Sequence, residues 1–370
     1  MKKILVLVLA LILALGSFAA LAEAVDPATI EDTITSEDGT YAVAFVTDVG
    51  ALKDKSFNEG TWNGVKAYAA ANGLTYKYYQ PASGDQATDD DRFDAMKAAA
   101  EAGAQCIVCA GFMQGTALAQ AAAAYPDVKF VFIDGWAMSD LTNTLGVAFK
   151  EEQCGYFAGY AVVREGFEHL GFSGGGGGDN PACCRYGYGF IQGANDAAAE
   201  MGKTVDMKFT WAYGASFQAS PELQTLVSGW YETGTDIVFS CGGSIFSSIT
   251  AAAAANDCYV IGVDVDQSFD SDTVVTSALK GITEATAWAC AKAFDGTWDE
   301  VGGGAVSLGA ADNAVGLPTE TWSMENFTVE EYEAMKAAVA AGEIVIDDAA
   351  ANGDPNQKGP WENVTVDYVE

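Results

Sequence analysis

The sequence predicts an α/β fold of two lobes, each built on a doubly wound parallel sheet, with hinge strands joining them. Three observations support this class. Short β-rich runs alternate with helical stretches of about 10–15 residues, which is typical of βαβ units. The alternation occurs in two successive halves of similar size. The 370 residues suffice for about two domains of ordinary size.

The first half contains five predicted strands with helices between them. Apolar residues recur at helical spacing after the first strand, as in Trp62, Val65 and Tyr68, and Gly73 is expected to end that helix. The predicted strands are Tyr41–Thr47, Thr75–Tyr79, Cys106–Ala110, Lys129–Ile133 and Leu145–Phe149.

The second half repeats this alternation. Its predicted strands are Leu170–Ser173, Asp206–Trp211, Asp236–Ser240, Tyr259–Val263 and Val274–Leu279. Helices are expected near Tyr188–Met201, Pro221–Thr233 and Phe246–Asn256, and two more within Gly281–Phe294 and Phe327–Gly342. We therefore assign 41–150 plus about 281–318 to lobe 1, 151–280 plus about 319–350 to lobe 2, and 351–370 to a C-terminal tail.

The amino-terminal segment predicts export. Lys2 and Lys3 precede an apolar run that begins at Ile4, and small residues lead to an Ala-x-Ala end at Ala22. This pattern is typical of a secretory signal peptide, here 1–22, and the run is shorter than the roughly 20 residues that span a bilayer. Residues 23–40 form a polar leader.

Composition excludes several classes of function. The chain has 51 Asp and Glu against 18 Lys and Arg, a formal charge of −33, and no basic patch, which excludes nucleic-acid binding. His169 is the single histidine, so catalysis or metal binding based on histidine is excluded. Eight cysteines permit disulfides, but Cys106 and Cys109 lie on opposite faces of a buried strand. We therefore predict no metal site and no cofactor.

Ligands of open parallel sheets lie beyond the carboxyl ends of the strands. The residues that follow the predicted strands are therefore candidates for a site, and two facing lobes form a cleft that closes on a small molecule. These residues are Asp48, Gly111 and Phe112, Asp134, Gly174–Gly178, Gly242 and Gly243, and Asp264.

Several of these segments resemble a known family. Asp48–Asn58 (Asp-Val-Gly-Ala-Leu-Lys-Asp-Lys-Ser-Phe-Asn) and Ile261–Gln267 (Ile-Gly-Val-Asp-Val-Asp-Gln) are similar to signatures of the Bmp-type (basic membrane protein) solute-binding components of ABC transporters, a group that includes purine-nucleoside-binding lipoproteins. Supporting matches, spread over about Tyr41 to Ile346, are Tyr125–Asp134, Gly155–Tyr160, Gly189–Ala194, Ser277–Lys280, Val315–Leu317 and Gly342–Val345.

This resemblance implies a periplasmic-binding-protein type 1 fold whose cleft holds a nucleoside. Phe57 is then a stacking face for the base and Asn58 reads its edge, although a hydrophobic staple and a helix cap are the structural alternatives. Phe217 is similar to the opposing stacking residue, with Trp211 or Tyr213 as alternatives.

The resemblance assigns the polar contacts as well. Asp48 meets the base or its water, or else caps a turn, and Asp264 accepts the ribose hydroxyls. Lys280 resembles the lysine that reaches the ribose, although it could instead pair with a carboxylate such as Asp264. Gly242 and its neighbour Gly243 allow close backbone approach to the ligand.

Two departures from the family pattern matter. Many members carry an aspartate where this chain has Thr116, which leaves base preference open, and Gln114 could substitute. Many relatives also carry a lipid-modified cysteine after the signal peptide, whereas the first cysteine here is Cys106. The protein is therefore expected to be extracellular, on the cell surface or periplasmic, without a lipid at that junction.

We accordingly predict an exported solute-binding protein, a monomer without enzymatic activity. It is expected to capture a nucleoside, with a purine favoured, in a cleft between the lobes, and to deliver it to the permease of an ABC transporter. A binding protein for another small solute, a ligand sensor and, less favoured, a carboxylate-dependent nucleoside hydrolase are the alternatives. The hydrolase would use Asp264, Asp266, Asp270 and Asp272.

Overall fold

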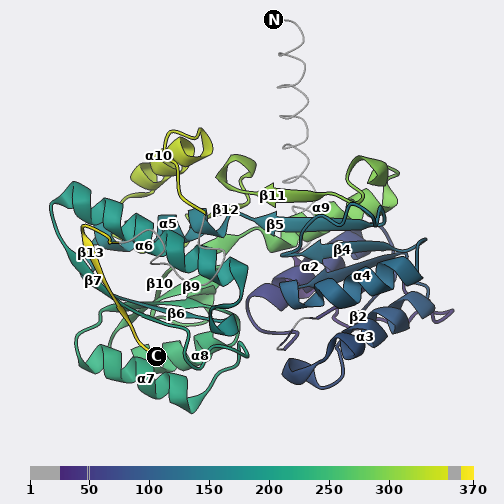
Figure 1. Ribbon diagram of the computed structural model, residues 1–370, viewed down its shortest axis with the longest axis horizontal. Coiled ribbons are helices and arrows are strands. Elements are labelled where there is room, and N and C mark those ends of the chain that lie inside the picture. Colours follow the sequence, from purple (N-terminus) through teal and green to yellow (C-terminus); the bar gives the residue numbers. More distant parts are fainter. Residues whose placement is uncertain (1–25, 48, 50, 349–359) are drawn as a thin grey trace, which may run out of the picture. The chain divides into compact units, whose positions relative to one another are not determined.

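The computed structural model describes residues 26–47, 49, 51–348 and 360–370 and divides the chain into two compact units (Figure 1). Unit 1 comprises the chain up to Leu52, Asn58–Ala148 and Ile282–Ser307. Unit 2 comprises Lys53–Phe57, Phe149–Gly281 and Leu308–Glu370. Each unit contains its own largely parallel sheet, which confirms the predicted α/β class. The predicted signal peptide and the candidate Asp48 lie outside the described residues.

Unit 1 has a six-stranded sheet in the order β11-β5-β4-β3-β1-β2. Its strands are β1 (Val43–Val46), β2 (Tyr76–Tyr79), β3 (Cys106–Ala110), β4 (Lys129–Ile133), β5 (Thr144–Phe149) and β11 (Ala305–Leu308). Its helices are α2 (Phe57–Ala71), α3 (Asp89–Glu101), α4 (Gly115–Ala124) and α9 (Ile282–Phe294). The strands from β2 to β5 pair in parallel, and α3 and α4 share an apolar core with β1, β3 and β4.

The polar leader is attached to unit 1. Lys66, on α2, has a fully buried side chain, and its Nζ lies 2.8 Å from the carboxylate of Asp32. The indole N–H of Trp62 donates to the same carboxylate, and the hydroxyl of Tyr76 donates to the carbonyl of Glu31. A buried ammonium requires such partners, so these contacts hold residues 31 and 32 against α2 and β2.

Unit 2 has a seven-stranded sheet in the order β12-β10-β9-β8-β6-β7-β13. Its strands are β6 (His169–Gly174), β7 (Val205–Thr210), β8 (Ile237–Cys241), β9 (Tyr259–Asp264), β10 (Val274–Lys280), β12 (Val315–Gly316) and β13 (Val364–Tyr368). Its helices are α5 (Glu151–Glu165), α6 (Pro181–Met201), α7 (Pro221–Glu232), α8 (Ile245–Ala255) and α10 (Val329–Ala340). Figure 1 shows α5 and α6 on one face of this sheet and α7 and α8 on the other.

Helices α5 and α6 are in backbone contact. A Cβ atom at Gly155 would lie 2.0 Å from the carbonyl oxygen of Tyr186, and one at Gly189 would lie 2.0 Å from that of Glu152. Side chains larger than hydrogen therefore cannot occupy these positions without separating the helices. The close approach brings the first turn of α5 beside α6, which positions the charged cluster described below.

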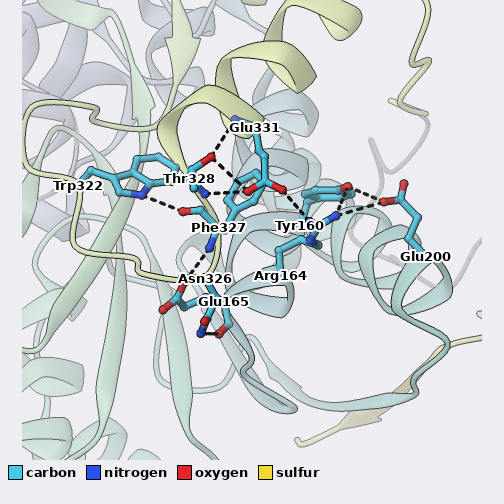
Figure 2. A network of polar contacts seen from close by, with 9 residues as sticks. All are labelled: Tyr160, Arg164, Glu165, Glu200, Trp322, Asn326, Phe327, Thr328 and Glu331. Carbon is cyan, nitrogen blue, oxygen red and sulfur yellow. Dashed lines mark hydrogen bonds and ion pairs between the residues drawn. The ribbon is translucent and has the colours of Figure 1, made fainter.

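The carboxyl-terminal region belongs to unit 2, because it is bonded to the end of α5 (Figure 2). The carboxylate of Glu165 accepts the backbone N–H groups of Asn326 and Phe327. Arg164 pairs with Glu331, the residue that closes the capping box of α10, at 2.9 Å. These bonds tie the start of α10 to α5.

Several boundaries differ from the predicted ones. Lys53–Phe57 and residues 149–150 were predicted for lobe 1 but lie in unit 2. Residues 308–318 were assigned to lobe 1, but they lie in unit 2, where β12 pairs antiparallel with β10. Residues 351–370 were assigned to a tail, but Val364–Tyr368 forms β13, which pairs in parallel with β7. The described part of the chain contains no helix long and apolar enough to cross a membrane. All eight cysteines are free thiols.

Candidate ligand-binding site

The predicted site residues of unit 2 gather at the carboxyl ends of its strands. Asp264 is the last residue of β9 and Lys280 the last of β10, and Asp264 is paired in register with Leu279. Asp264 is 7 % exposed and Lys280 4 %. The parallel sheet thus places a carboxylate and an ammonium side by side in a largely dry environment.

Lys280 pairs with Glu151, and this was not predicted. Its Nζ lies 3.1 Å from Oε1 of Glu151 and 5.1 Å from the ring centroids of both Phe57 and Phe149. An ammonium over an aromatic face is attracted by the ring quadrupole. The described carboxylate partner of Lys280 is therefore Glu151, from the first turn of α5, where the sequence had suggested Asp264.

Glu151 is fully buried and has a second cationic partner. Its Oε2 lies 2.7 Å from Nη2 of Arg185, on α6. Burial alone would raise the pKa of Glu151, but the charges of Lys280 and Arg185 outweigh that effect and hold the pKa below its ordinary value. Glu151 is therefore an anion between two cations.

The described hydrogen bonds of the Asp264 side chain come from hydroxyl groups. The hydroxyl of Ser56 donates to Oδ2 at 2.5 Å, and the hydroxyl of Tyr186 donates to Oδ1 at 3.3 Å. Burial raises the pKa of Asp264, while Lys280 and the Ser56 hydrogen bond oppose that rise. The surroundings of this carboxylate thus already consist of hydroxyl donors.

The segment Lys53–Phe57 belongs to unit 2 and is held there by side-chain contacts. Gln267 donates to the carbonyl oxygen of Lys55 at 2.9 Å, and the Lys55 ammonium pairs with Asp270. Asp54 accepts the backbone N–H of Ser56. The side chain of Phe57 is half-buried, so the predicted stacking ring stands in the same cluster as Lys280.

Phe217 lies over two glycines. A Cβ at Gly175 would lie 2.2 Å from the Phe217 ring, and one at Gly242 would lie 3.1 Å from it. Gly242 has a φ of 151° and Phe217 itself has a φ of 59°, both in the region that favours glycine. Because Gly242 has no side chain, the Phe217 ring and the backbone of Gly175 can both lie close to it.

The two alternatives to Phe217 have different surroundings. Trp211 packs against Phe172 and Phe209, and its ring would lie 2.0 Å from a Cβ at Gly174, so it is part of the core packing. Tyr213 is 54 % exposed on the loop after β7.

The predicted ligand contacts of unit 1 differ in how far their side chains are buried. Thr116 is exposed on the first turn of α4, whereas Gln114 is fully buried. Gln114 donates from Nε2 to the carbonyl oxygen of Thr47 at 2.7 Å, and its Oε1 has no hydrogen-bond partner. Asn58 is 3 % exposed and donates to the carbonyl oxygen of Val49 at 3.4 Å.

The acidic residues proposed for a hydrolase do not converge. Asp266 accepts hydrogen bonds from Ser268 and Thr321, and Asp270 pairs with Lys55. Within the residues that the structure describes, no group of three or more His, Cys, Asp or Glu side chains could hold a metal ion.

The sequence analysis missed Glu151, Arg185 and Tyr186. Glu151 lies two residues beyond the predicted strand that ends at Phe149, so inspection of the strand ends could have found it. Arg185 and Tyr186 lie within a helix, and no local sequence signal distinguishes them, because only the crossing of α5 and α6 brings them to the cluster.

The comparisons with known proteins agree with this architecture. The family model described as "Bmp: ABC transporter substrate-binding protein PnrA-like" matches residues 41–349. Among curated proteins, the "ABC transporter nucleoside-binding protein BmpA" of Lactococcus lactis subsp. cremoris is 26% identical over 82% of this chain and 88% of its own length. "Basic membrane protein A" of Borreliella burgdorferi is 25% identical over 86% of this chain and 89% of its own length.

Solved structures share the fold. An ABC transporter solute-binding protein from Aeropyrum pernix superposes with a TM-score of 0.69 at 22% identity, over 83% of this chain and 94% of that one. A solute-binding protein from Conexibacter woesei gives a TM-score of 0.65 at 18% identity, over 84% and 99% of the two chains. These likenesses confirm the predicted periplasmic-binding-protein type 1 fold. The chain thus belongs to the Bmp family of PnrA-like substrate-binding proteins of ABC transporters, which bind small ligands and work with membrane permeases.

Proposed function

We propose that this substrate-binding protein captures a nucleoside, with a purine favoured, and delivers it to its ABC-transporter permease without making or breaking a bond. The observation that carries the proposal is the buried carboxylate of Asp264, which accepts two hydroxyl groups beside Lys280 and Phe57. A ribose presents vicinal hydroxyls, and a carboxylate with two oxygens can accept both of them.

The aromatic residues of unit 2 support the same ligand class. A nucleobase has two flat faces, and two half-buried rings are available: Phe57, the first residue of α2, and Phe217, in the loop after β7. Stacking on such rings discriminates little between bases. The Lactococcus relative is named as a nucleoside-binding protein, which agrees with this ligand class.

The residues that would read the base edge lie in unit 1. Asn58 and Thr116 are the proposed contacts there, with Asp48 as a third. Thr116 supplies a hydroxyl where many family members supply a carboxylate, so its hydrogen-bonding preference is less restricted. Base preference is therefore the part of the proposal that the experiment must determine.

The cellular setting completes the proposal. The amino-terminal pattern is that of a secretory signal peptide, and the family works outside the cytoplasmic membrane. We propose a monomer, exported and held at or near the cell surface by means other than a lipid on the signal-peptide junction.

The test is isothermal titration of the purified, ligand-stripped chain without 1–22. The panel contains inosine, guanosine, adenosine, uridine, the free bases, ribose and riboflavin. Saturable 1:1 binding of a nucleoside, with no base released on chromatography, is expected. Binding of another solute alone would overturn the nucleoside assignment and leave the family unaffected, and release of free base would indicate a hydrolase.

A matched pair of variants connects the binding to the site. Asp264→Asn keeps the shape of the side chain but removes the charge that accepts hydroxyls, so riboside binding should fall. Asp266→Asn changes a neighbouring carboxylate that is bonded to Ser268 and Thr321, and it should bind as the wild type does. Equal affinities of the two variants would remove Asp264 from the site.

A further inference from the structure

The pair of buried carboxylates beside Lys280 needs an explanation. Lys280 pairs with Glu151, yet Asp264 lies close to it as well, and both carboxylates are at least nine-tenths buried. Burying a carboxylate is costly unless it is paired, so a second one is expected to have its own purpose.

The two carboxylates have different partners. Glu151 contacts two cations, Lys280 at 3.1 Å and Arg185 at 2.7 Å. Asp264 accepts the hydroxyls of Ser56 and Tyr186, although it is paired in register with the residue before Lys280. Of these two carboxylates, Glu151 binds the Lys280 ammonium and Asp264 binds hydroxyl donors.

We propose that Glu151 is a positioning residue of the ligand site, which holds the Lys280 ammonium over Phe57 and keeps it from pairing with Asp264. This inference rests on the nucleoside-binding function proposed above. Asp264 ends β9, which pairs with β10, so a Lys280 ammonium without Glu151 can turn to Asp264. A pair between them would occupy the oxygens that accept hydroxyl groups.

The charges of four described residues oppose one another. Glu151 and Asp264 are opposed by Lys280 and Arg185, so these four groups together supply no excess of positive charge for a phosphorylated ligand. This balance agrees with a neutral diol such as a riboside. The described ionisable groups that interact with Lys280 come from three elements: Glu151 and Cys154 on α5, Cys241 on β8 and Asp264 on β9.

The test is Glu151→Gln in the mature chain, with Glu152→Gln as the matched control. Glu152 is the next residue of α5, is 5 % exposed, and makes no ion pair among the described contacts. Titrations use inosine and hypoxanthine between pH 6 and pH 9. We expect Glu151→Gln to weaken inosine binding about tenfold or more and hypoxanthine binding much less, because only the riboside uses Asp264.

The pH profile separates positioning from a general loss of structure. Lys280 has one buried carboxylate fewer beside it in Glu151→Gln, so its pKa should fall. Because only the protonated lysine pairs with Asp264, the defect of Glu151→Gln should be largest at pH 6 and shrink toward pH 9. The control and the wild type should show no such trend. Inosine affinity equal to that of the wild type in a folded Glu151→Gln protein would overturn the inference.

A double-mutant cycle with Lys280→Met supplies the second check. If Glu151 acts through Lys280, adding Glu151→Gln to Lys280→Met should change inosine affinity by less than about twofold. This double variant removes one anion and one cation, so it is also expected to fold if the single variant does not. Additive losses in the two variants would refute a role through Lys280.

One measurement does not depend on the ligand. The titration of Lys280 can be followed by NMR of carbon-labelled lysine, with the signal assigned from Lys280→Met. A lower pKa in Glu151→Gln than in the wild type is expected, and an unchanged pKa would overturn the inference even if no nucleoside binds. Failure of inosine binding in the wild type would instead refute the proposed function alone.

Discussion

The contact between α5 and α6 predicts a large loss of stability for Gly189→Ala. The new Cβ would lie 2.0 Å from the carbonyl oxygen of Glu152, whereas ordinary contacts begin at 3.4 Å. The helices would therefore have to separate by about 1.4 Å, and the obstructing atom is backbone that cannot rotate away.

The magnitude follows from two opposing effects. Overpacking of a tight contact costs about 1–3 kcal/mol, and a rigid backbone partner favours the upper end of that range. Replacing glycine by alanine inside a helix recovers about 1 kcal/mol. The free energy of unfolding of unit 2 should therefore fall by about 2 kcal/mol, a large part of the 5–15 kcal/mol typical of a domain.

Gly229→Ala is the matched control within the same unit. Gly229 lies inside α7, and nothing lies within 4 Å of the position of a Cβ there. The same substitution should stabilise unit 2 by about 0.5–1 kcal/mol, because helix propensity alone acts. Urea unfolding followed by circular dichroism measures both variants. Equal stabilities of Gly189→Ala and Gly229→Ala would refute the argument from backbone contact.

Three further results are expected. Phe57→Ala should weaken nucleoside binding by about 1–3 kcal/mol through lost stacking while the melting temperature stays within a few degrees; unchanged affinity by calorimetry would remove Phe57 from the site. Asp264→Ala should weaken binding of ribosides far more than binding of free bases, and equal losses for both would reject a contact with the ribose. Burial raises the pKa of Glu152 from its ordinary 4.5 to about 7. The contribution of neutral Glu152 to the free energy of unfolding is therefore complete below pH 4.5 and is lost as the pH rises through 7. Glu152→Gln should therefore exceed the wild type by about 3 kcal/mol at pH 8 and match it at pH 4 in urea unfolding; equal stabilities at pH 8 would show that Glu152 is not neutral there.

The fold was predictable from local patterns. Each of the ten predicted strands coincides with a strand of the structure, since short β-rich runs bounded by turns are fully buried in parallel sheets. The candidate residues at strand ends were predictable for the same reason, because parallel strands bring their carboxyl ends to one edge. Asp264 and Lys280 come together in this way, although 15 residues separate the ends of their strands.

Other features depend on contacts between distant segments. β12 has two residues, and β13 follows a stretch without periodicity, so neither carries a pattern of its own. Their places are set by pairing with β10 and β7. The place of α10 likewise depends on its attachment to the end of α5, through Arg164 and Glu331.

By itself, the sequence determined the α/β class, the repeated halves and the excess of acidic residues, and it suggested most of the candidates for ligand contact. Periodicity, composition and strand-end position are local properties, and each can be read without knowing which segments meet. Only the tertiary structure decided that Lys280 pairs with Glu151 and that Asp264 accepts hydroxyls. The choice between two carboxylates depends on distances of a few ångströms, and those are set by the close crossing of α5 and α6 over β9 and β10.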